Sequence, residues 1–381
     1  MKFSTRAVHT GQTPDPTTGA VIPPLYISTT YEQDSPGVHK GYEYSRSQNP
    51  TRESLEAALA SLEEGEACAA FASGLAATNA VLQILQPGDG IVAGHDLYGG
   101  TFRLLNSVFK PWGLEIVRSE SADPDAYKTA LAALKRPRMV WIESPTNPLI
   151  DIVDIAAVCE VVKANSDAHV IVDNTFATPY LQQPLKLGAD YVMHSTTKYL
   201  GGHSDVIGGA IIARTEKLLE PIRYLQNAAG LIPGPFDCYL VQRGLKTLAL
   251  RMDRHCANAQ QLAEALTGMK GLARVMYPGL PDHPGYAVAK KQMRAFGGMI
   301  SIELADGFEA AKAFCSKVNV FTLAESLGGV ESLCSHPPSM THASVPAEER
   351  RARGINDGFV RLSVGIEDVD DLIADVRQAL A

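Results

Sequence analysis

The sequence predicts an α/β fold in which helices cover a mostly parallel sheet, followed by a smaller C-terminal α+β domain. From about residue 67, short apolar runs alternate with segments that have a helical period. Several of these runs are apolar at consecutive positions, which is typical of strands buried on both faces. The chain has 381 residues, of which 45% are hydrophobic, so it can bury one large core and a second, smaller one.

The first fifty residues are rich in Pro, Gly, Thr and Tyr and show no helical period. We therefore interpret residues 1–52 as an ordered arm, which ends in the segment "GYEYSRSQNPTR". A helix follows, with Leu55, Leu59 and Leu62 on one apolar stripe, and it opens a large domain predicted over 53–240.

Six strands are predicted within this large domain. They are the runs at 68–73, 90–94, 139–144, 169–175, 191–197 and 208–214. Ligands bind beyond the carboxyl ends of the strands in such sheets. Ser73, Glu143, Asp173 and Lys198 each lie at or just after a predicted strand, so they are candidate site residues.

A helical pattern over 236–266 predicts one long helix that bridges to the C-terminal domain, predicted over 241–381. This domain is expected to contain the strands and helices of an α+β layer. The predicted strands are 274–279, 297–304, 317–324 and 359–366, and the predicted helices are 309–318 and 369–380.

Composition excludes several classes of protein. The formal net charge is -8 and there is no cluster of Lys or Arg, so neither nucleic acid nor an anionic membrane is an expected partner. The N-terminus lacks the apolar stretch of a signal peptide, and no apolar run is long enough to span a bilayer. Six scattered cysteines without a C-x-x-C pair predict neither structural zinc nor a disulfide framework. A cytoplasmic location is expected.

Two segments point to an anion site and a buried cation. In "FASGLAA", Ser73 and Gly74 join a strand to a helix, whose first amides favour an anion, although Ser73 can equally act only as an N-cap. Asp173 ends a buried strand in "HVIVDNT", where a carboxylate needs a partner. An Asx-turn provides one such partner, and a protonated pyridine nitrogen provides another.

Lys198 has a setting that an ordinary exposed lysine does not require. In "HSTTKYLGGHSD", hydroxyl residues that can bind phosphate precede it and glycines that leave room for a bulky adduct follow it. A lysine desolvated beside a cationic ring loses its proton readily and can attack an aldehyde. Together with the anion site and Asp173, this lysine points to pyridoxal 5'-phosphate (PLP) as the cofactor.

The sequence resembles the Cys/Met-metabolism PLP enzymes. The resemblance runs from about residue 4 to the C-terminus and includes "EYSRSQNPTR", "DLYGGTFR", "ESPTNP", "VDNTFATP", "HSTTKYLGGHSDV", "FTLAESLGG" and "RLSVGIED". It implies the fold-type-I, aspartate aminotransferase-like fold, and a homo-oligomer that is usually a homotetramer built as a dimer of dimers. The family includes cystathionine γ-synthase, γ-lyase and β-lyase, methionine γ-lyase and O-acetylhomoserine sulfhydrylase.

The resemblance also implies roles for residues that bind the cofactor. Lys198 would hold it as a Schiff base, Asp173 would pair with the ring nitrogen, and Tyr98 would stack over the ring. Lys198 and Tyr98 are thereby the expected catalytic residues. Phosphate would be bound by the backbone amides and hydroxyls of Gly74, Leu75, Ser195 and Thr197.

Other residues are implied to complete the site from the neighbouring subunit or to bind substrate. Tyr44 and Arg46 resemble the pair that reaches the phosphate of the neighbouring subunit, so the arm would act in trans. Asn147 and Arg361 resemble the residues that hold the substrate α-carboxylate, Arg361 by a bidentate fork, and Ser326 would lie beside them.

Two positions favour cystathionine γ chemistry. "LYGGTFR" resembles the enzymes in which an arginine, here Arg103, meets the distal end of the substrate, whereas methionine γ-lyases carry a cysteine where this chain has Gly100. Glu325 resembles the acid that favours γ over β chemistry. We therefore predict a cystathionine γ-synthase that joins cysteine to an activated homoserine. The main alternative is cystathionine γ-lyase; methionine γ-lyase, O-acetylhomoserine sulfhydrylase and β-lyase are less favoured.

Two rival hypotheses come from other classes of protein. A metal hydrolase would use His203 and Asp205 with His194 or His342, but their spacing matches no established ligand set. A non-catalytic scaffold is disfavoured because the lysine, aspartate and arginine set is complete. We therefore predict no metal site.

Overall fold

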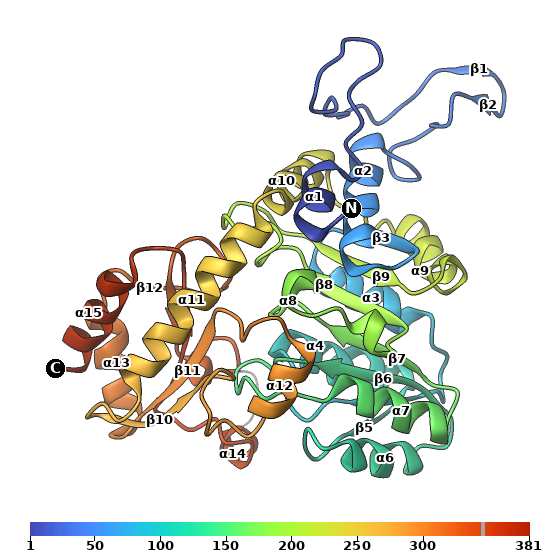
Figure 1. Cartoon of the computed structure of the whole chain (residues 1–381). Coiled ribbons are helices and arrows are strands. Elements are labelled where there is room, and N and C mark those ends of the chain that lie inside the picture. Colours follow the sequence, from blue (N-terminus) through green and yellow to red (C-terminus); the bar gives the residue numbers. More distant parts are fainter. Residues whose placement is uncertain (344–346) are drawn as a thin grey trace.

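The computed structural model describes residues 1–343 and 347–381 and contains one large sheet covered by helices (Figure 1). The large sheet has seven strands in the order β3-β9-β8-β7-β6-β4-β5. They are β3 (Ala67–Phe71), β4 (Gly90–Ala93), β5 (Glu115–Arg118), β6 (Pro137–Glu143), β7 (His169–Asp173), β8 (Tyr191–Ser195) and β9 (Gly209–Ala213). Only β9 runs antiparallel to its neighbours β3 and β8, so the predicted, mostly parallel α/β architecture is confirmed.

Both faces of this sheet are buried, which explains the apolar runs. In β7, Val170 and Val172 pack into one core with the helices α6 (Pro124–Ala132) and α7 (Ile155–Asn165). Ile171 points the other way, into a core with α3 (Gly74–Gln83) and α9 (Glu216–Ala228). Successive side chains of a strand point to opposite faces, so each position of such a strand has to be apolar.

The C-terminal sheet has five strands in the order β10-β11-β14-β13-β12. They are β10 (Leu272–Met276), β11 (Met299–Leu304), β12 (Thr322–Leu323), β13 (Leu333–Ser335) and β14 (Phe359–Ser363). Helices α13 (Gly307–Lys317) and α15 (Val369–Leu380) share its core, as the sequence predicts. The strand β13 was not predicted because it has only three residues.

The prediction of one long helix over 236–266 is wrong. The chain forms α10 (Pro235–Leu245) and α11 (Leu248–Leu266), separated by a turn. Gly244 is packed so closely against the preceding loop that a Cβ there would lie 2.3 Å from the carbonyl oxygen of Gly201. The Gly244 carbonyl accepts hydrogen bonds from the Thr247 amide (3.2 Å) and from the Arg251 guanidinium (2.8 Å) instead of continuing the helix.

The N-terminal arm contains one helix that was not predicted from the sequence, α1 (Phe3–His9). The Arg6 guanidinium fixes it to the body by donating to the Ser61 carbonyl at 2.5 Å and to the Glu64 carboxylate at 2.8 Å. Further along, the hairpin of β1 (Gln33–Ser35) and β2 (Val38–His39) stands away from the body (Figure 1). The arm thus lies largely outside the core of its own subunit.

The arm leads into α2 (Pro50–Glu63), whose predicted stripe of Leu55, Leu59 and Leu62 is fully buried. Asn49 caps this helix, because its side chain accepts hydrogen bonds from the amides of Thr51 and Arg52. The remaining helices are α4 (Gly99–Leu104), α5 (Lys110–Trp112), α8 (Thr178–Leu181), α12 (Tyr286–Gln292) and α14 (Ala347–Ala352), with a π-helix at Leu105–Phe109 and 3-10 turns at Pro184–Leu187 and Pro337–Ser339. Within the described residues, no helix is both long and apolar enough to cross a membrane.

Candidate active site

A cavity of about 1060 Å³ lies beyond the carboxyl ends of β6, β7 and β8, with residues of the C-terminal domain in its wall. This is where ligands bind in open α/β sheets. The predicted site residues that line it are Gly74, Leu75, Tyr98, Asn147, Asp173, Ser195, Thr197, Lys198, Glu325, Ser326 and Arg361. Ser73 and Glu143, singled out by their place after a strand, line it as well.

Lys198 follows β8 and points toward the C-terminal wall of the cavity. Its Nζ donates to the Ser326 Oγ at 2.7 Å. Burial, and secondarily the positive charge of Arg361, lower the pKa of Lys198 to about 8, while Glu325 acts in the opposite direction. The amine is therefore a far better nucleophile and base at neutral pH than an exposed lysine.

This lowered pKa predicts how the cofactor-free protein reacts with pyridoxal phosphate. The association rate should rise about tenfold per pH unit below pH 8 and level off above it, because only the neutral amine attacks the aldehyde. Stopped-flow absorbance between pH 6 and 10 measures this rate, and Lys198→Ala protein reports the background from other lysines. A rate still rising steeply above pH 9 contradicts the lowered pKa.

Two buried carboxyl groups lie side by side at the end of the sheet. Asp173 in β7 and Glu143 in β6 are partners in the parallel register and are 7% and 5% exposed. Asp173 accepts from the Thr175 amide at 3.1 Å, and Glu143 accepts from the Tyr98 amide at 2.9 Å. Burial raises the pKa of both groups, and Asp173 raises that of Glu143 further. A cation in the cavity would stabilise the ionised form of these carboxyl groups. The pair therefore fits a protonated pyridine nitrogen.

The start of α3 and the end of β8, which both line the cavity, fit a phosphate. Ser73 caps α3 by accepting from the Ala76 amide at 3.0 Å, so its expected N-cap role is confirmed. Gly74 lets the start of α3 approach β8: a Cβ there would lie 3.0 Å from the Cβ of Ser195. The Thr197 hydroxyl already exchanges hydrogen bonds with the Gly208 backbone at 3.1 and 3.2 Å. The backbone amides at the start of α3 and the hydroxyls of Ser195 and Thr197 are hydrogen-bond donors that suit an anion, and Gly74 allows these groups to lie close together.

Arg361, in β14, is fixed where it can bind a carboxylate. Its side chain is only 2% exposed, and burial lowers its pKa to about 10, so it stays charged at neutral pH. Nη1 donates to the Asn147 Oδ1 and Nη2 to the Ser326 carbonyl, both at 2.8 Å, whereas the buried Nε has no hydrogen-bond partner within the described residues. The guanidinium of Arg361 is fixed by its other two nitrogens, so the free Nε–H can donate a hydrogen bond to the carboxylate of a substrate.

Three predicted site residues lie outside the cavity. Tyr44 is 45% exposed on the arm, and Arg46 beside it donates to the carbonyl of Asn227 at 2.9 Å. Arg103 is exposed on α4 and does not line the cavity either. Their proposed roles therefore do not follow from contacts inside one chain.

The structure also contains a buried contact that the sequence did not reveal. Glu63, at the end of α2, accepts from the Asn174 side chain at 2.8 Å and lies 2.6 Å from Nε2 of His194. Both Glu63 and His194 are 0% exposed, and they tie α2 to the strand ends that carry Asp173 and Ser195. His194 is thus engaged with one carboxylate, and the described residues contain no group of three or more His, Cys, Asp or Glu that could hold a metal ion.

Comparison with known proteins agrees with this geometry. The sequence model of a family described as "Cys/Met metabolism PLP-dependent enzyme" matches residues 4–381. The chain is 54% identical over 379 residues to a cystathionine gamma-synthase of Mycobacterium tuberculosis, covering 99% of this chain and 96% of that protein. It is equally 54% identical over 380 residues to a cystathionine beta-lyase of Coxiella burnetii, covering 99% and 97%. The solved structure of a cystathionine gamma synthase from Xanthomonas oryzae pv. oryzae, in complex with aminoacrylate and cysteine, has a TM-score of 0.96 at 46% identity and covers 100% of this chain and 98% of that one.

Proposed function

The chain belongs to the family of Cys/Met metabolism PLP-dependent enzymes, and we propose that it is a cystathionine γ-synthase. In this reaction the sulfur of cysteine replaces the γ-substituent of an O-activated homoserine. The observation that carries the proposal is that Ser326 holds two residues of the cavity together: the Lys198 amine bonds to its hydroxyl and the Arg361 guanidinium bonds to its carbonyl, each at 2.8 Å or less. A base is thereby held beside a carboxylate site, as the chemistry of an amino acid requires.

Different residues of the cavity would bind the cofactor, bind the substrate and transfer protons. Bound PLP supplies an electron-withdrawing ring that acidifies the hydrogens on the α-carbon of the substrate. Asp173 would hold the protonated ring nitrogen, and Tyr98, which lines the same cavity, would pack against the ring. Asn147 and Arg361 bind the substrate α-carboxylate and fix its α-carbon. Lys198, with its pKa near 8, would remove the α-proton, give that proton up again and then, as a neutral amine, remove a β-proton, so that the γ-substituent can depart with its bonding electrons.

Glu325 is the residue in the wall on which the choice of γ chemistry is proposed to depend. It lines the cavity next to Ser326 and is exposed, so its carboxylate is available to a distal ammonium group. We expect Glu325→Gln to reduce γ-replacement about threefold while reducing β-elimination of cystathionine less, because one exposed ion pair, worth about 1 kcal/mol or less, is lost. Separate assays of cystathionine formation and pyruvate release measure the two rates. Equal losses of both rates would contradict a selective role.

A product assay tests the proposed activity against its alternatives. The purified holoenzyme is incubated with O-succinylhomoserine, O-acetylhomoserine or cystathionine, each with and without cysteine. A γ-synthase gives cystathionine when cysteine is added to a homoserine ester. Equal 2-oxobutanoate with and without cysteine indicates γ-lyase, and pyruvate from cystathionine indicates β-lyase. This assay is needed because relatives named synthase and lyase are equally similar to this chain.

Tyr44 and Arg46 support a second part of the proposal, an active site shared between subunits of a homo-oligomer, which we propose to be a tetramer. Both side chains are exposed on the arm and outside their own cavity. Mixing inactive Arg46→Ala subunits with inactive Lys198→Ala subunits should restore activity at up to about one site in four, because one of the two sites in a mixed dimer is intact. Activity after subunit exchange measures this, and an inactive mixture contradicts action in trans.

A further inference from the structure

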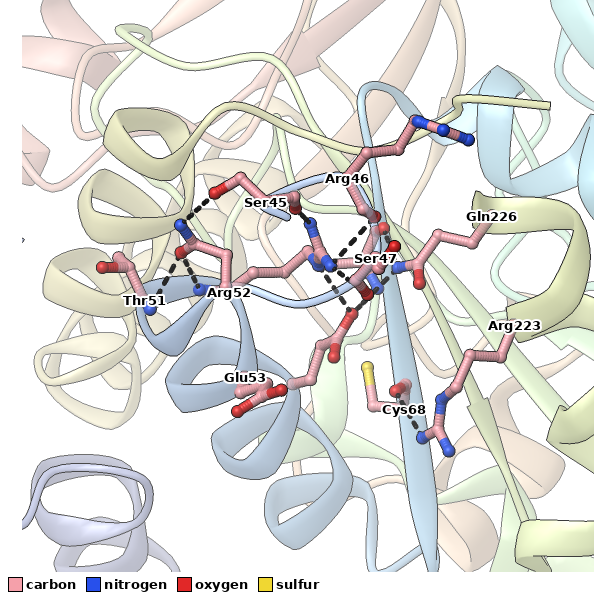
Figure 2. A network of polar contacts seen from close by, with 12 residues as sticks. Ser45, Arg46, Ser47, Thr51, Arg52, Glu53, Cys68, Arg223 and Gln226 are labelled. Atoms are coloured by element: carbon pink, nitrogen blue, oxygen red, sulfur yellow. Dashed lines mark hydrogen bonds and ion pairs between the residues drawn. The ribbon is translucent and has the colours of Figure 1, made fainter. Parts of the chain in front are cut away.

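Arg52 is a buried arginine that holds the turn of the arm in place. It lies in the first turn of α2 and is 3% exposed. Its Nη1 donates to the Ser45 carbonyl at 2.8 Å, and its Nη2 donates to the carbonyls of Ser47 at 2.9 Å and Arg46 at 3.3 Å (Figure 2). One guanidinium therefore satisfies three consecutive backbone carbonyls, which fixes the conformation of residues 45–47.

The charge of Arg52 is balanced from the side of the sheet. The Glu56 Oε1 lies 3.8 Å from the Arg52 Nε, one helical turn further along α2. The same oxygen accepts from the Ala70 amide in β3 at 2.8 Å and from the Gln226 side chain in α9 at 2.9 Å (Figure 2). Gln226 also donates to the Ala70 carbonyl at 2.6 Å. The arm turn is thus connected through Arg52 and Glu56 to the edge of the large sheet.

The turn is also fixed from its other side. Asn49 donates to the Ser45 hydroxyl at 2.8 Å, and that hydroxyl donates to the Ser28 carbonyl at 2.8 Å. The amides of Ser47 and Gln48 both donate to the Tyr44 carbonyl at 3.0 Å. All of these bonds involve backbone groups or buried side chains of the turn, and none involves the side-chain tip of Tyr44 or Arg46.

The two side chains presented by this rigid turn are exposed. Figure 2 shows the Arg46 side chain directed away from Arg52 and the labelled network. Its guanidinium lies 5.6 Å from the Tyr44 ring centroid, and its only described polar contacts are with Asn227, at the surface. A network of this size is not required to hold an arginine in solvent. It is required if the arginine has to meet a ligand outside its own subunit at a defined place.

We propose that Arg52 is a positioning residue that sets the affinity of the neighbouring subunit's site for the phosphate of pyridoxal phosphate, by fixing the turn that carries Tyr44 and Arg46. This inference rests on the proposed action of Arg46 in trans. Loss of the Arg52 hydrogen bonds leaves Arg46 chemically intact but lets its backbone move. The turn then has to become ordered each time the phosphate binds, and this loss of conformational entropy weakens binding.

The test uses Arg52→Lys, which keeps the charge beside Glu56 but cannot span three carbonyls. The matched control is Arg223→Lys in the same region: Arg223 contacts Glu216 and the Cys68 carbonyl but no carbonyl of the arm turn. We expect about tenfold weaker binding of pyridoxal phosphate to cofactor-free Arg52→Lys protein, and no change for Arg223→Lys. Hydrogen exchange should also become faster at the amides of Ser45, Ser47 and Gln48 in Arg52→Lys alone.

Hybrid dimers show in which subunit Arg52 acts. In a hybrid of Arg52→Lys and Lys198→Ala subunits, the one site with Lys198 receives an intact arm, so cofactor affinity should be normal. In a hybrid of wild-type and Arg52→Lys/Lys198→Ala subunits, the one site with Lys198 receives the loosened arm, so affinity should fall about tenfold. Borohydride reduction at limiting cofactor counts the occupied Lys198 sites in each hybrid. The reverse pattern, or unchanged exchange at the arm amides, overturns the proposal.

The same hybrids made with Arg46→Ala separate this inference from the proposed function. If Arg46→Ala weakens cofactor binding in trans but Arg52→Lys does not, only the positioning role of Arg52 is wrong. If Arg46→Ala shows no effect in trans, the proposed sharing of the site between subunits is wrong.

Discussion

Lys198→Ala is expected to lower kcat by about 10³-fold or more for any substrate of this enzyme, because it removes the general base that we assign to the α-proton, beside the proposed α-carboxylate site. The substitution should leave the rest of the cavity in place, since the Lys198 side chain makes one hydrogen bond to the described part of the chain, to Ser326. Steady-state kinetics and the melting temperature together measure the effect, and the melting temperature should change little.

Two controls accompany this substitution. Lys186→Ala removes an exposed lysine whose ion pair with Glu64 is at the surface, and it should leave kcat unchanged. Borohydride reduction followed by peptide mapping should place the pyridoxyl group on Lys198 in the wild-type protein and in Lys186→Ala. A label on another lysine, or substantial turnover by Lys198→Ala, contradicts the assigned role.

Arg361→Lys is expected to lower kcat/KM about 100-fold, mostly through KM for the amino-acid substrate. A charged hydrogen bond of this kind is worth about 2–3 kcal/mol, and a lysine cannot donate to Asn147, Ser326 and a carboxylate in the same plane. Because lysine retains the positive charge of Arg361, the substitution does not remove a cation from the cavity that contains the buried carboxyl groups of Glu143 and Asp173. The measurement is a KM and kcat determination for each substrate.

The matched control for this change is Arg274→Lys, on β10 of the same sheet. Arg274 is exposed and pairs with Glu303 at 3.4 Å, and neither residue lines the cavity. It should alter neither kcat nor KM. An Arg361→Lys enzyme with wild-type KM would show that the substrate carboxylate binds elsewhere.

Local sequence was sufficient to predict six of the seven strands of the large sheet and their carboxyl-end residues, but not the edge strand β5, which is only half-buried. The runs around Val172 and Val192 are apolar on both faces, and this pattern directly reflects burial between two helical layers. Because all of these strands except β9 run in one direction, Asp173 and Lys198 had to emerge at the same edge. The motifs of the family added the identity of the ligand.

Other features depended on packing between distant segments. The sequence alone did not place a break between α10 and α11, because the close contact of Gly244 with Gly201 is made by a loop more than forty residues earlier in the chain. The clamp of Arg52 on the arm and the buried contact of Glu63 with His194 likewise have no local signature, since any arginine or glutamate on a helix is expected to be solvated.

The sequence by itself therefore determined the class of fold, the cofactor and the residues at the ends of the strands, because hydrophobic periodicity and short motifs are local properties. The resemblance implied that Asn147, Arg361 and Ser326 share one carboxylate site, but only the tertiary structure showed the direct bonds of Arg361 to Asn147, 214 residues away, and of Lys198 to Ser326, 128 residues away. Such contacts join residues next to the large sheet with residues of the C-terminal sheet and its loops, and their distances are set by the packing of both cores, which no local pattern encodes.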